Sequence, residues 1–150
     1  DGAGLDDEQR QLREFYRRLL TLTRDNKAIN SGKMYDLEYA QGQGFNKHEQ
    51  YAYLRKAGDE VLLIALNFDD RQVDMQINIP SDAFVYMEQE EIQRADAVDL
   101  LTDTVYPNLT FTASEPTCIT LPAWKGAILR ITQRMTHKTT TNKMTKTCKK

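Results

Sequence analysis

The stretch from Tyr51 to Phe68, YAYLRKAGDEVLLIALNF, constrains the fold more than any other part of the chain. Gly58 and Asp59 stand where the turn of a β-hairpin needs permissive residues, so two antiparallel strands are predicted. The second arm, VLLIALNF, is apolar on both faces, whereas a strand with one solvated face alternates apolar and polar residues. We therefore expect this strand to lie in the middle of the molecule, with another layer of structure on each side.

A helix is predicted from Asp6 to about Asn26, because apolar residues recur there at spacings of three and four. Acidic residues at its start and basic residues in its later turns suit the helix dipole. The apolar positions are Leu12, Phe15, Tyr16, Leu19, Leu20 and Leu22. One face of VLLIALNF should meet an opposing sheet, and this helix, around Leu12, Tyr16 and Leu19, should cover the other.

After Gly32 the pattern changes to short strands separated by turn residues. The clearest alternation of apolar and polar residues runs through residues 71–79 and ends at Pro80. The other predicted strands are residues 33–40, 51–56, 61–68, 97–103, 108–113, 117–121 and 125–131, and residues 81–96 read as a helical turn with an acidic excursion. The pattern predicts a mainly β fold: an antiparallel β-sandwich of about eight strands preceded by one N-terminal α-helix.

The chain length of 150 residues allows one domain, or one domain with an appendage. We predict an N-terminal helix in residues 1–31, a β-sandwich domain in residues 32–131, and a basic Thr/Lys-rich tail in residues 132–150. The tail lacks apolar periodicity, so we expect it to be disordered. The opening letters, DGAGLDDEQ, read like the middle of a longer sequence, from which an upstream signal would be missing.

The net charge of −2 conceals an uneven distribution of charge. Residues 132–150 hold six of the 20 basic residues and no acidic one, which leaves 14 basic against 22 acidic residues, a net −8, in residues 1–131. This acidic body argues against nucleic acid as the main partner, because phosphate binding needs a basic surface. No apolar run approaches the roughly 20 residues of a membrane-spanning helix, so no membrane span is expected.

Residues suited to catalysis are scarce. His48 and His137 are far apart in the sequence, which gives a metal site or a catalytic triad little to build on. The acidic clusters at residues 6–8, 69–70 and 88–91 lie in polar, turn-like contexts, whereas glycoside hydrolysis needs a carboxylic acid with a raised pKa in a pocket. We therefore predict no catalytic residue, no metal ligand and no cofactor site.

The two cysteines, Cys118 and Cys148, provide no disulfide framework. Cys118 lies in an apolar strand and is expected to be a small buried hydrophobic residue. Cys148 belongs to the predicted tail. Neither cysteine indicates a cellular compartment.

Aromatic side chains are the remaining candidates for a binding site, because sugar-binding modules stack pyranose rings on exposed Trp and Tyr. The predicted carbohydrate-binding residues are Trp124, Tyr51 and Tyr53. Further candidates of the same kind are Tyr35, Tyr39, Tyr86 and Tyr106. For each tyrosine the alternative is a position in or beside the core, with only the hydroxyl reaching solvent.

Several segments together resemble one known family. Residues 12–34 are similar to the passage in α-amylase-type enzymes where the last barrel helix leads into the C-terminal domain, and residues 51–77 are similar to that domain's hairpin. The segments DLLTD (99–103) and ITLPAWKGAILRI (119–131) resemble its later strands. The family is glycoside hydrolase family 13, the α-amylase and neopullulanase group, and the resemblance covers roughly residues 8–131.

This resemblance implies a non-catalytic C-terminal domain of an enzyme that acts on α-glucans such as starch. The family's catalytic carboxylates lie on an upstream βα barrel, so none carries over to a residue of this chain. The implied partner is the parent enzyme's own catalytic barrel, which the domain would pack on and stabilise, with an α-glucan as a second candidate. Such a parent would act in the periplasm or outside the cell, although this sequence itself leaves the compartment unknown.

Two alternatives stay open beside this reading. The chain could be a carbohydrate-binding module that uses its exposed aromatic residues, or an unrelated sandwich that serves protein–protein contact. Two polar residues match the family pattern within the hairpin: Asn67 is expected to cap the NFDD turn through its side chain, and Arg55 has no predicted role.

Overall fold

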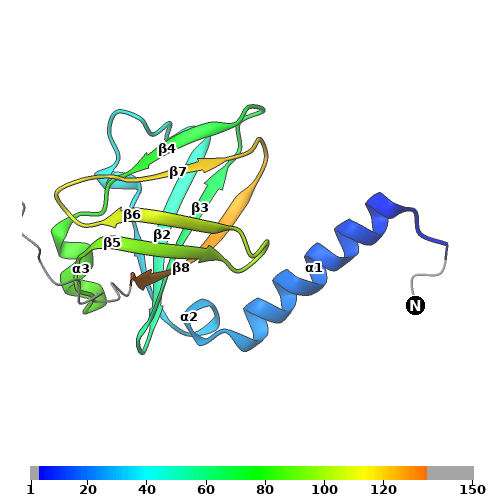
Figure 1. Ribbon diagram of the computed structural model, residues 1–150, viewed down its shortest axis with the longest axis horizontal. Helices are drawn as coiled ribbons and strands as arrows, with labels where there is room; N and C mark the ends of the chain where they lie inside the picture. Colours follow the sequence, from blue (N-terminus) through cyan, green and yellow to red (C-terminus); the bar gives the residue numbers. More distant parts are fainter. Residues whose placement is uncertain (1–3, 135–150) are drawn as a thin grey trace, which may run out of the picture.

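The computed structural model describes residues 4–134 and shows a β-sandwich from which one long helix projects (Figure 1). The strands are β1 (Lys33–Asp36), β2 (Gln50–Ala57), β3 (Glu60–Asn67), β4 (Val73–Ile77), β5 (Ile92–Asp99), β6 (Val105–Phe111), β7 (Thr117–Leu121) and β8 (Gly126–Gln133). The helices are α1 (Asp7–Asp25), α2 (Lys27–Asn30), α3 (Ser81–Met87) and the 3-10 helix η1 (Glu38–Ala40). Within the described residues, the predicted mainly β fold of about eight strands after an N-terminal helix is confirmed.

The strands form two antiparallel sheets. One has six strands in the order β1–β2–β3–β8–β5–β6, and the other pairs β4 with β7. The predicted hairpin is β2 and β3, with Tyr51 opposite Leu66 and Leu54 opposite Leu63. Strand β8 pairs with the other edge of β3, so the apolar arm is central, as its sequence predicts.

The main core lies between the two sheets. Leu63 of β3 and Leu54 of β2 pack there with Met75 of β4, Phe111 of β6 and Leu121 of β7. Each of these side chains is almost completely buried. The alternation of apolar residues along β4 and β7 supplies the second layer of the sandwich.

A smaller core covers the opposite face of β3. Leu62 and Ile64 contact Ala28 of α2 there, together with Leu19 and Leu22 near the end of α1. The close fit leaves no room for a side chain at position 32, since a Cβ on Gly32 would lie 2.5 Å from the carbonyl oxygens of Ala28 and Lys56. Both faces of the apolar arm are therefore covered from Val61 to Ala65, each by a different part of the chain, while Phe68 at its end is 52% exposed.

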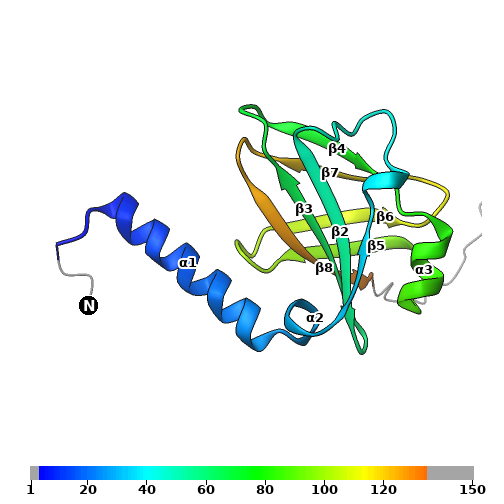
Figure 2. The ribbon, with the colours of Figure 1, turned by 180° about the vertical axis from the view of Figure 1, so that it is seen from behind.

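Helix α1 covers this face with its last turns only. The prediction that it lies over β3 is confirmed at Leu19 but wrong at Leu12 and Tyr16, which are 57% and 54% exposed. Both ribbon views show the cause, because α1 runs away from the sandwich toward its N-terminal end (Figures 1 and 2). None of the helices in residues 4–134 is long and apolar enough to cross a membrane.

The two ends of α1 are defined by side-chain caps. The Asp6 carboxylate accepts the Gln9 backbone N–H at 2.8 Å, and the Gln9 side chain accepts the Asp6 N–H at 3.1 Å. At the other end Asn26 ends α1 and caps α2, where its Oδ1 accepts the Ile29 N–H at 3.1 Å. Its amide also donates to the Glu60 carboxylate at 2.7 Å, which connects the break between the helices to β3.

Three predicted segments differ from the structure in their secondary structure. Of the strand predicted for residues 97–103, only residues 97–99 belong to β5, and the chain turns after Asp99. The strand predicted for residues 33–40 ends at Asp36, whose carboxylate accepts the Glu38 N–H at 2.8 Å and turns the chain into η1. Residues 81–96 resolve into helix α3 and the first half of β5. The predicted domain boundaries stay a prediction, although β8 runs to Gln133, two residues into the segment predicted as a tail. The rest of that tail, from residue 135, lies outside the described residues.

Cys118 is exposed, so the prediction that it is buried is wrong. The alternation along β7 explains the error, because Thr117, Ile119 and Leu121 turn toward the core and leave Cys118 on the outer face. Cys148 lies outside the described residues.

Candidate functional site

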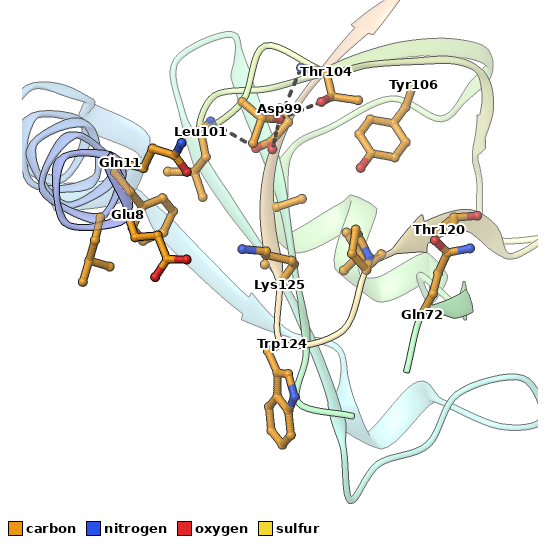
Figure 3. Close-up of a pocket in the computed structure, with 17 residues that line it drawn as sticks. Glu8, Gln11, Gln72, Asp99, Leu101, Thr104, Tyr106, Thr120, Trp124 and Lys125 are labelled. Atoms are coloured by element: carbon orange, nitrogen blue, oxygen red, sulfur yellow. Dashed lines mark hydrogen bonds between the residues drawn. The ribbon is translucent and has the colours of Figure 1, made fainter. Parts of the chain in front are cut away.

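A cleft of about 710 Å³ lies between α1 and one end of the sandwich (Figure 3). Its apolar lining comprises Leu12 and Phe15 from α1 and Leu101, Tyr106, Leu121, Pro122 and Trp124 from the sandwich. In Figure 3, Glu8 and Gln11 approach from the helix, Tyr106 and Thr120 stand on the other side, and Lys125 lies between. A concave surface of this size and composition is typical of binding sites.

The apolar stripe of α1 continues beyond this cleft. Leu12, Phe15, Tyr16 and Leu20, which we call the α1 apolar face, are exposed at 57%, 44%, 54% and 64%. No residue of α1 is buried. An amphipathic helix normally turns its apolar side to a core, so a bare apolar side indicates a surface that contacts another molecule or another domain.

Trp124 lies at the lower edge of the cleft in Figure 3, on the loop between β7 and β8. Its side chain is 67% exposed, and its backbone has φ of 55°, in the left-handed region that favours glycine. Such a conformation costs a bulky residue about 1 kcal/mol or more, and it is held here by a hydrogen bond from the Trp124 N–H to the Asp69 carbonyl at 3.1 Å. A large exposed ring in a strained position supports a role in contact outside the chain.

The loop that holds Trp124 depends on Asn67 and Asp69. The Asn67 amide donates to the carbonyls of Arg71 and Pro122, both at 2.9 Å, and its oxygen accepts the Asp69 N–H at 2.9 Å. The Asp69 carboxylate in turn accepts the backbone N–H of Arg71 at 3.0 Å and two guanidinium hydrogen bonds at 3.2 Å. The predicted capping role of Asn67 is thus confirmed, and it extends across to the Trp124 loop.

Hydrogen bonding to Arg71 lowers the pKa of Asp69 from 3.8 to about 2. Because the folded-state pKa is depressed, Asp69 contributes its stability fully above its unfolded pKa and loses it as the pH falls from 3.8 to about 2. We expect the urea midpoint of the chain to fall more steeply across this window than that of Asp69→Asn. Denaturation curves at several pH values between 5 and 2 measure the difference, with Asp59→Asn, an exposed aspartate in the turn between β2 and β3, as the control. Parallel profiles for the chain and Asp69→Asn would contradict this assignment.

Asp99 is the buried carboxylate of the cleft. Its oxygens accept the backbone N–H of Leu101 at 3.1 Å, the N–H of Ile128 at 3.0 Å and the hydroxyl of Thr102 at 2.6 Å. These bonds join the turn after β5 to β8 and engage both oxygens of Asp99. The other acid of the lining, Glu8, is exposed on α1. Asp99, the first residue of the segment DLLTD (99–103), therefore has a structural role: it holds the turn after β5 against β8.

The last residue of DLLTD connects this turn to α1. The Arg18 guanidinium donates to both oxygens of Asp103, at 3.0 and 2.6 Å, and to the Leu100 carbonyl at 2.7 Å. The hydrogen bonds from Arg18 lower the pKa of Asp103 below its ordinary value. Helix α1 is therefore attached to the sandwich at Arg18 and beyond, while its first half is not.

The sequence predicts no role for Arg55, and the structure shows one. Its Nε donates to the Ala28 carbonyl at 2.8 Å and its Nη2 donates to the Ile29 carbonyl at 2.5 Å, so it satisfies the end of the short helix α2. Arg55 follows the apolar residues of β2 in the sequence, and a charged side chain in that position is the signal that could have indicated hydrogen bonding to buried backbone carbonyls. Arg18 and Asp99 are the other residues whose roles the sequence did not indicate.

The structure does not bring the three predicted carbohydrate-binding residues into one cleft. Trp124 lines the cleft described above, and neither Tyr51 nor Tyr53 is among its lining residues. The two tyrosines are neighbours on β2 with ring centroids 5.5 Å apart, and both are half-buried, Tyr53 against the smaller core. Burial, followed by the charge of Asp36, raises the pKa of Tyr51. Sugar binding by these residues stays a prediction. Among residues 4–134, no group of His, Cys, Asp and Glu is arranged to hold a metal ion.

Comparison with solved structures finds a fold similar to that of this chain within larger enzymes. The match to AmyP in complex with maltose has a TM-score of 0.59 and 19% identity, and covers 85% of this chain. The α-amylase of Geobacillus thermoleovorans complexed with acarbose matches with a TM-score of 0.59 and 11% identity over 83% of the chain. The trehalulose synthase MutB of Pseudomonas mesoacidophila matches with a TM-score of 0.51 and 19% identity over 79%.

The chain has the fold of a domain found in α-amylase-family enzymes. The matched part is 22% of AmyP, 24% of the Geobacillus enzyme and 17% of the trehalulose synthase, so the chain spans about a fifth of the length of each. No protein-family model and no curated protein matches the sequence.

Proposed function

We propose that the chain is the non-catalytic C-terminal β-sandwich domain of an α-amylase-family enzyme that acts on α-glucans. Its role is to pack on the parent's catalytic barrel and to stabilise it. The observation that carries this proposal is the bare α1 apolar face beside an apolar cleft. The shared fold within much larger enzymes, some solved with maltose or acarbose, supports the same reading.

The docking surface consists of the α1 apolar face, the cleft and Trp124. Its parts are contributed by α1 and by the loops after β5 and β7, which lie on the same side of the sandwich. Because Trp124 lines the cleft together with Leu12 and Phe15, we assign its indole to this interdomain contact in preference to a sugar. A barrel seated here would bury apolar side chains that are now 44–67% exposed.

Complementation tests this proposal. The barrel, encoded upstream in the parent and produced separately, is expected to unfold at a higher temperature and to keep more activity when this chain is added. The chain alone is expected to release no reducing sugar from starch, pullulan or cyclodextrins. Turnover by the purified chain, or a barrel whose melting temperature does not respond to it, would contradict the proposal.

A carbohydrate-binding module is the second candidate, and the 67% exposure of Trp124 is the observation that favours it. Affinity electrophoresis in soluble starch separates the two functions. Retardation of the chain that is abolished by Trp124→Ala or Tyr51→Ala would support binding through these residues. Retention of the mobility shift in both variants would exclude them as the sugar site. For the remaining alternative, a sandwich that serves protein–protein contact elsewhere, no observation in the described residues offers specific support.

A further inference from the structure

A second group of exposed aromatic residues lies far from α1. Tyr35 of β1 and Tyr39 of η1 bind the carboxylate of Asp82 on α3, and the ring of Tyr86, also on α3, lies beside that of Tyr35. We call these four residues the tyrosine cluster. The ring centroid of Tyr35 lies 6.3 Å from that of Tyr39 and 5.7 Å from that of Tyr86. Tyr39 and Tyr86 are 61% and 51% exposed, while Tyr35 is half-buried against the main core.

Polar groups sit between these rings. The hydroxyls of Tyr35 and Tyr39 both donate to Oδ2 of Asp82, at 2.5 and 2.9 Å. These hydrogen bonds lower the pKa of Asp82, so its carboxylate is ionised at neutral pH. An ionised carboxylate has about four acceptor positions, of which the two tyrosines use two; the backbone N–H groups of Asp82 and Ala83 also interact with it.

The cluster stands on a fixed base. Lys33 donates to the Tyr86 carbonyl at 3.2 Å and pairs with the Glu88 carboxylate, and Lys56 donates to the Glu88 carbonyl at 2.5 Å. The Lys33 ammonium also lies 5.6 Å from the centroid of the Tyr86 ring. These contacts attach α3 to β1 and β2. We therefore expect the positions of the tyrosine rings to change little when a ligand binds.

We propose that the tyrosine cluster is a surface binding site for a pyranose ring of an oligosaccharide. Exposed aromatic faces bind the apolar side of a sugar ring, and ionised carboxylates and phenolic oxygens accept hydrogen bonds from its hydroxyls. Tyr39, the most exposed ring, is the main platform, and Tyr86 contributes a second surface. The assignment of the sugar to the α-glucan class rests on the proposed function above.

The position of the cluster makes it independent of the docking surface. Helix α3 lies at one end of the molecule and α1 projects from the other end in both ribbon views (Figures 1 and 2). A barrel packed against the α1 apolar face therefore leaves Tyr39 and Tyr86 exposed to solvent. The site would hold a polysaccharide at the side of the domain away from the barrel.

Titration of the 150-residue chain with maltoheptaose, followed by calorimetry and by amide chemical shifts, tests the proposal. Binding with chemical-shift changes at residues of the tyrosine cluster is expected. Tyr39→Ala should raise the Kd about tenfold, because it removes the main stacking surface, and Asp82→Asn should raise it several-fold. Tyr39 is exposed, so its replacement should leave the melting temperature nearly unchanged.

Two matched variants locate the site. Tyr16→Ala removes a similarly exposed tyrosine from α1 and should keep the Kd of the chain. Trp124→Ala removes the indole at the cleft and shows whether the sugar binds there instead of at the tyrosine cluster. Absence of binding to both maltoheptaose and cellohexaose, or binding lost in Trp124→Ala but kept in Tyr39→Ala, would overturn the proposal. Binding of cellohexaose in place of maltoheptaose would overturn the α-glucan assignment. Complementation of the barrel is measured separately, so a failed sugar titration leaves that proposal standing.

Discussion

Replacement of Asn67 by Ala is expected to lower the free energy of unfolding by about 3 kcal/mol. Asn67 is 2% exposed, and its amide nitrogen donates to the carbonyls of Arg71 and Pro122 while its oxygen accepts the Asp69 N–H. Alanine would leave these three backbone groups without their partner in a region with little water. Removal of one partner of a buried hydrogen bond costs about 1–3 kcal/mol, and here several such bonds are lost together.

Urea denaturation measures this effect. Asn30→Ala is the matched control, because Asn30 is exposed and donates through its side chain to the Arg24 carbonyl, and it should change the free energy of unfolding by about 0.5 kcal/mol or less. Because Asn67 also orders the loop that positions Trp124, its variant should show a changed environment of the single indole by fluorescence. A loss in Asn67→Ala no greater than in Asn30→Ala would contradict the structural role given to this residue.

The second large effect concerns association with the barrel. If the chain packs on a catalytic barrel as proposed, the double variant Leu12→Asp, Phe15→Asp is expected to weaken that binding at least about 100-fold, because two carboxylates would be buried in an apolar contact. Both side chains are exposed in the free chain, so the free energy of unfolding should fall by only about 1 kcal/mol, mainly through lower helix propensity. Calorimetric titration of the barrel with each variant measures the change.

Val85→Asp is the matched control for this pair. Val85 is 78% exposed on α3, at the end of the molecule opposite α1, so an aspartate there introduces one negative charge, against two in the double variant, outside the proposed contact. Its affinity for the barrel should equal that of the unmodified chain. Equal weakening by Val85→Asp, or unchanged binding by the double variant, would show that the barrel binds elsewhere.

The architecture could be predicted from the sequence because periodicity reports burial directly. The two-sided apolar run in β3 indicated a central strand, and the alternation in β4 indicated a strand with one face in the core. Prediction failed where periodicity is ambiguous over few residues. The chain leaves β1 at Asp36 because that side chain bonds to the Glu38 N–H, a local competition that an alternating pattern does not reveal.

The candidate sites were harder to predict than the fold. The apolar stripe of α1 was visible in the sequence, but a stripe does not say whether a core or solvent faces it, so Leu12 was assigned to the wrong environment. The tyrosine cluster joins residues 47 positions apart, Tyr35 and Asp82, through one hydrogen bond. No local sequence pattern predicts such a contact, because it forms only when β1 and α3 come together in the fold.

The short break at Asn26 has a consequence for assembly. The residue ends α1, begins α2 and donates to Glu60 of β3, while Arg18 joins α1 to the turn after β5. The direction of the projecting helix is thus set by the sandwich before any neighbour arrives. A barrel that receives this helix would meet a preorganised surface, so less conformational entropy would be lost on docking than with a flexible connection.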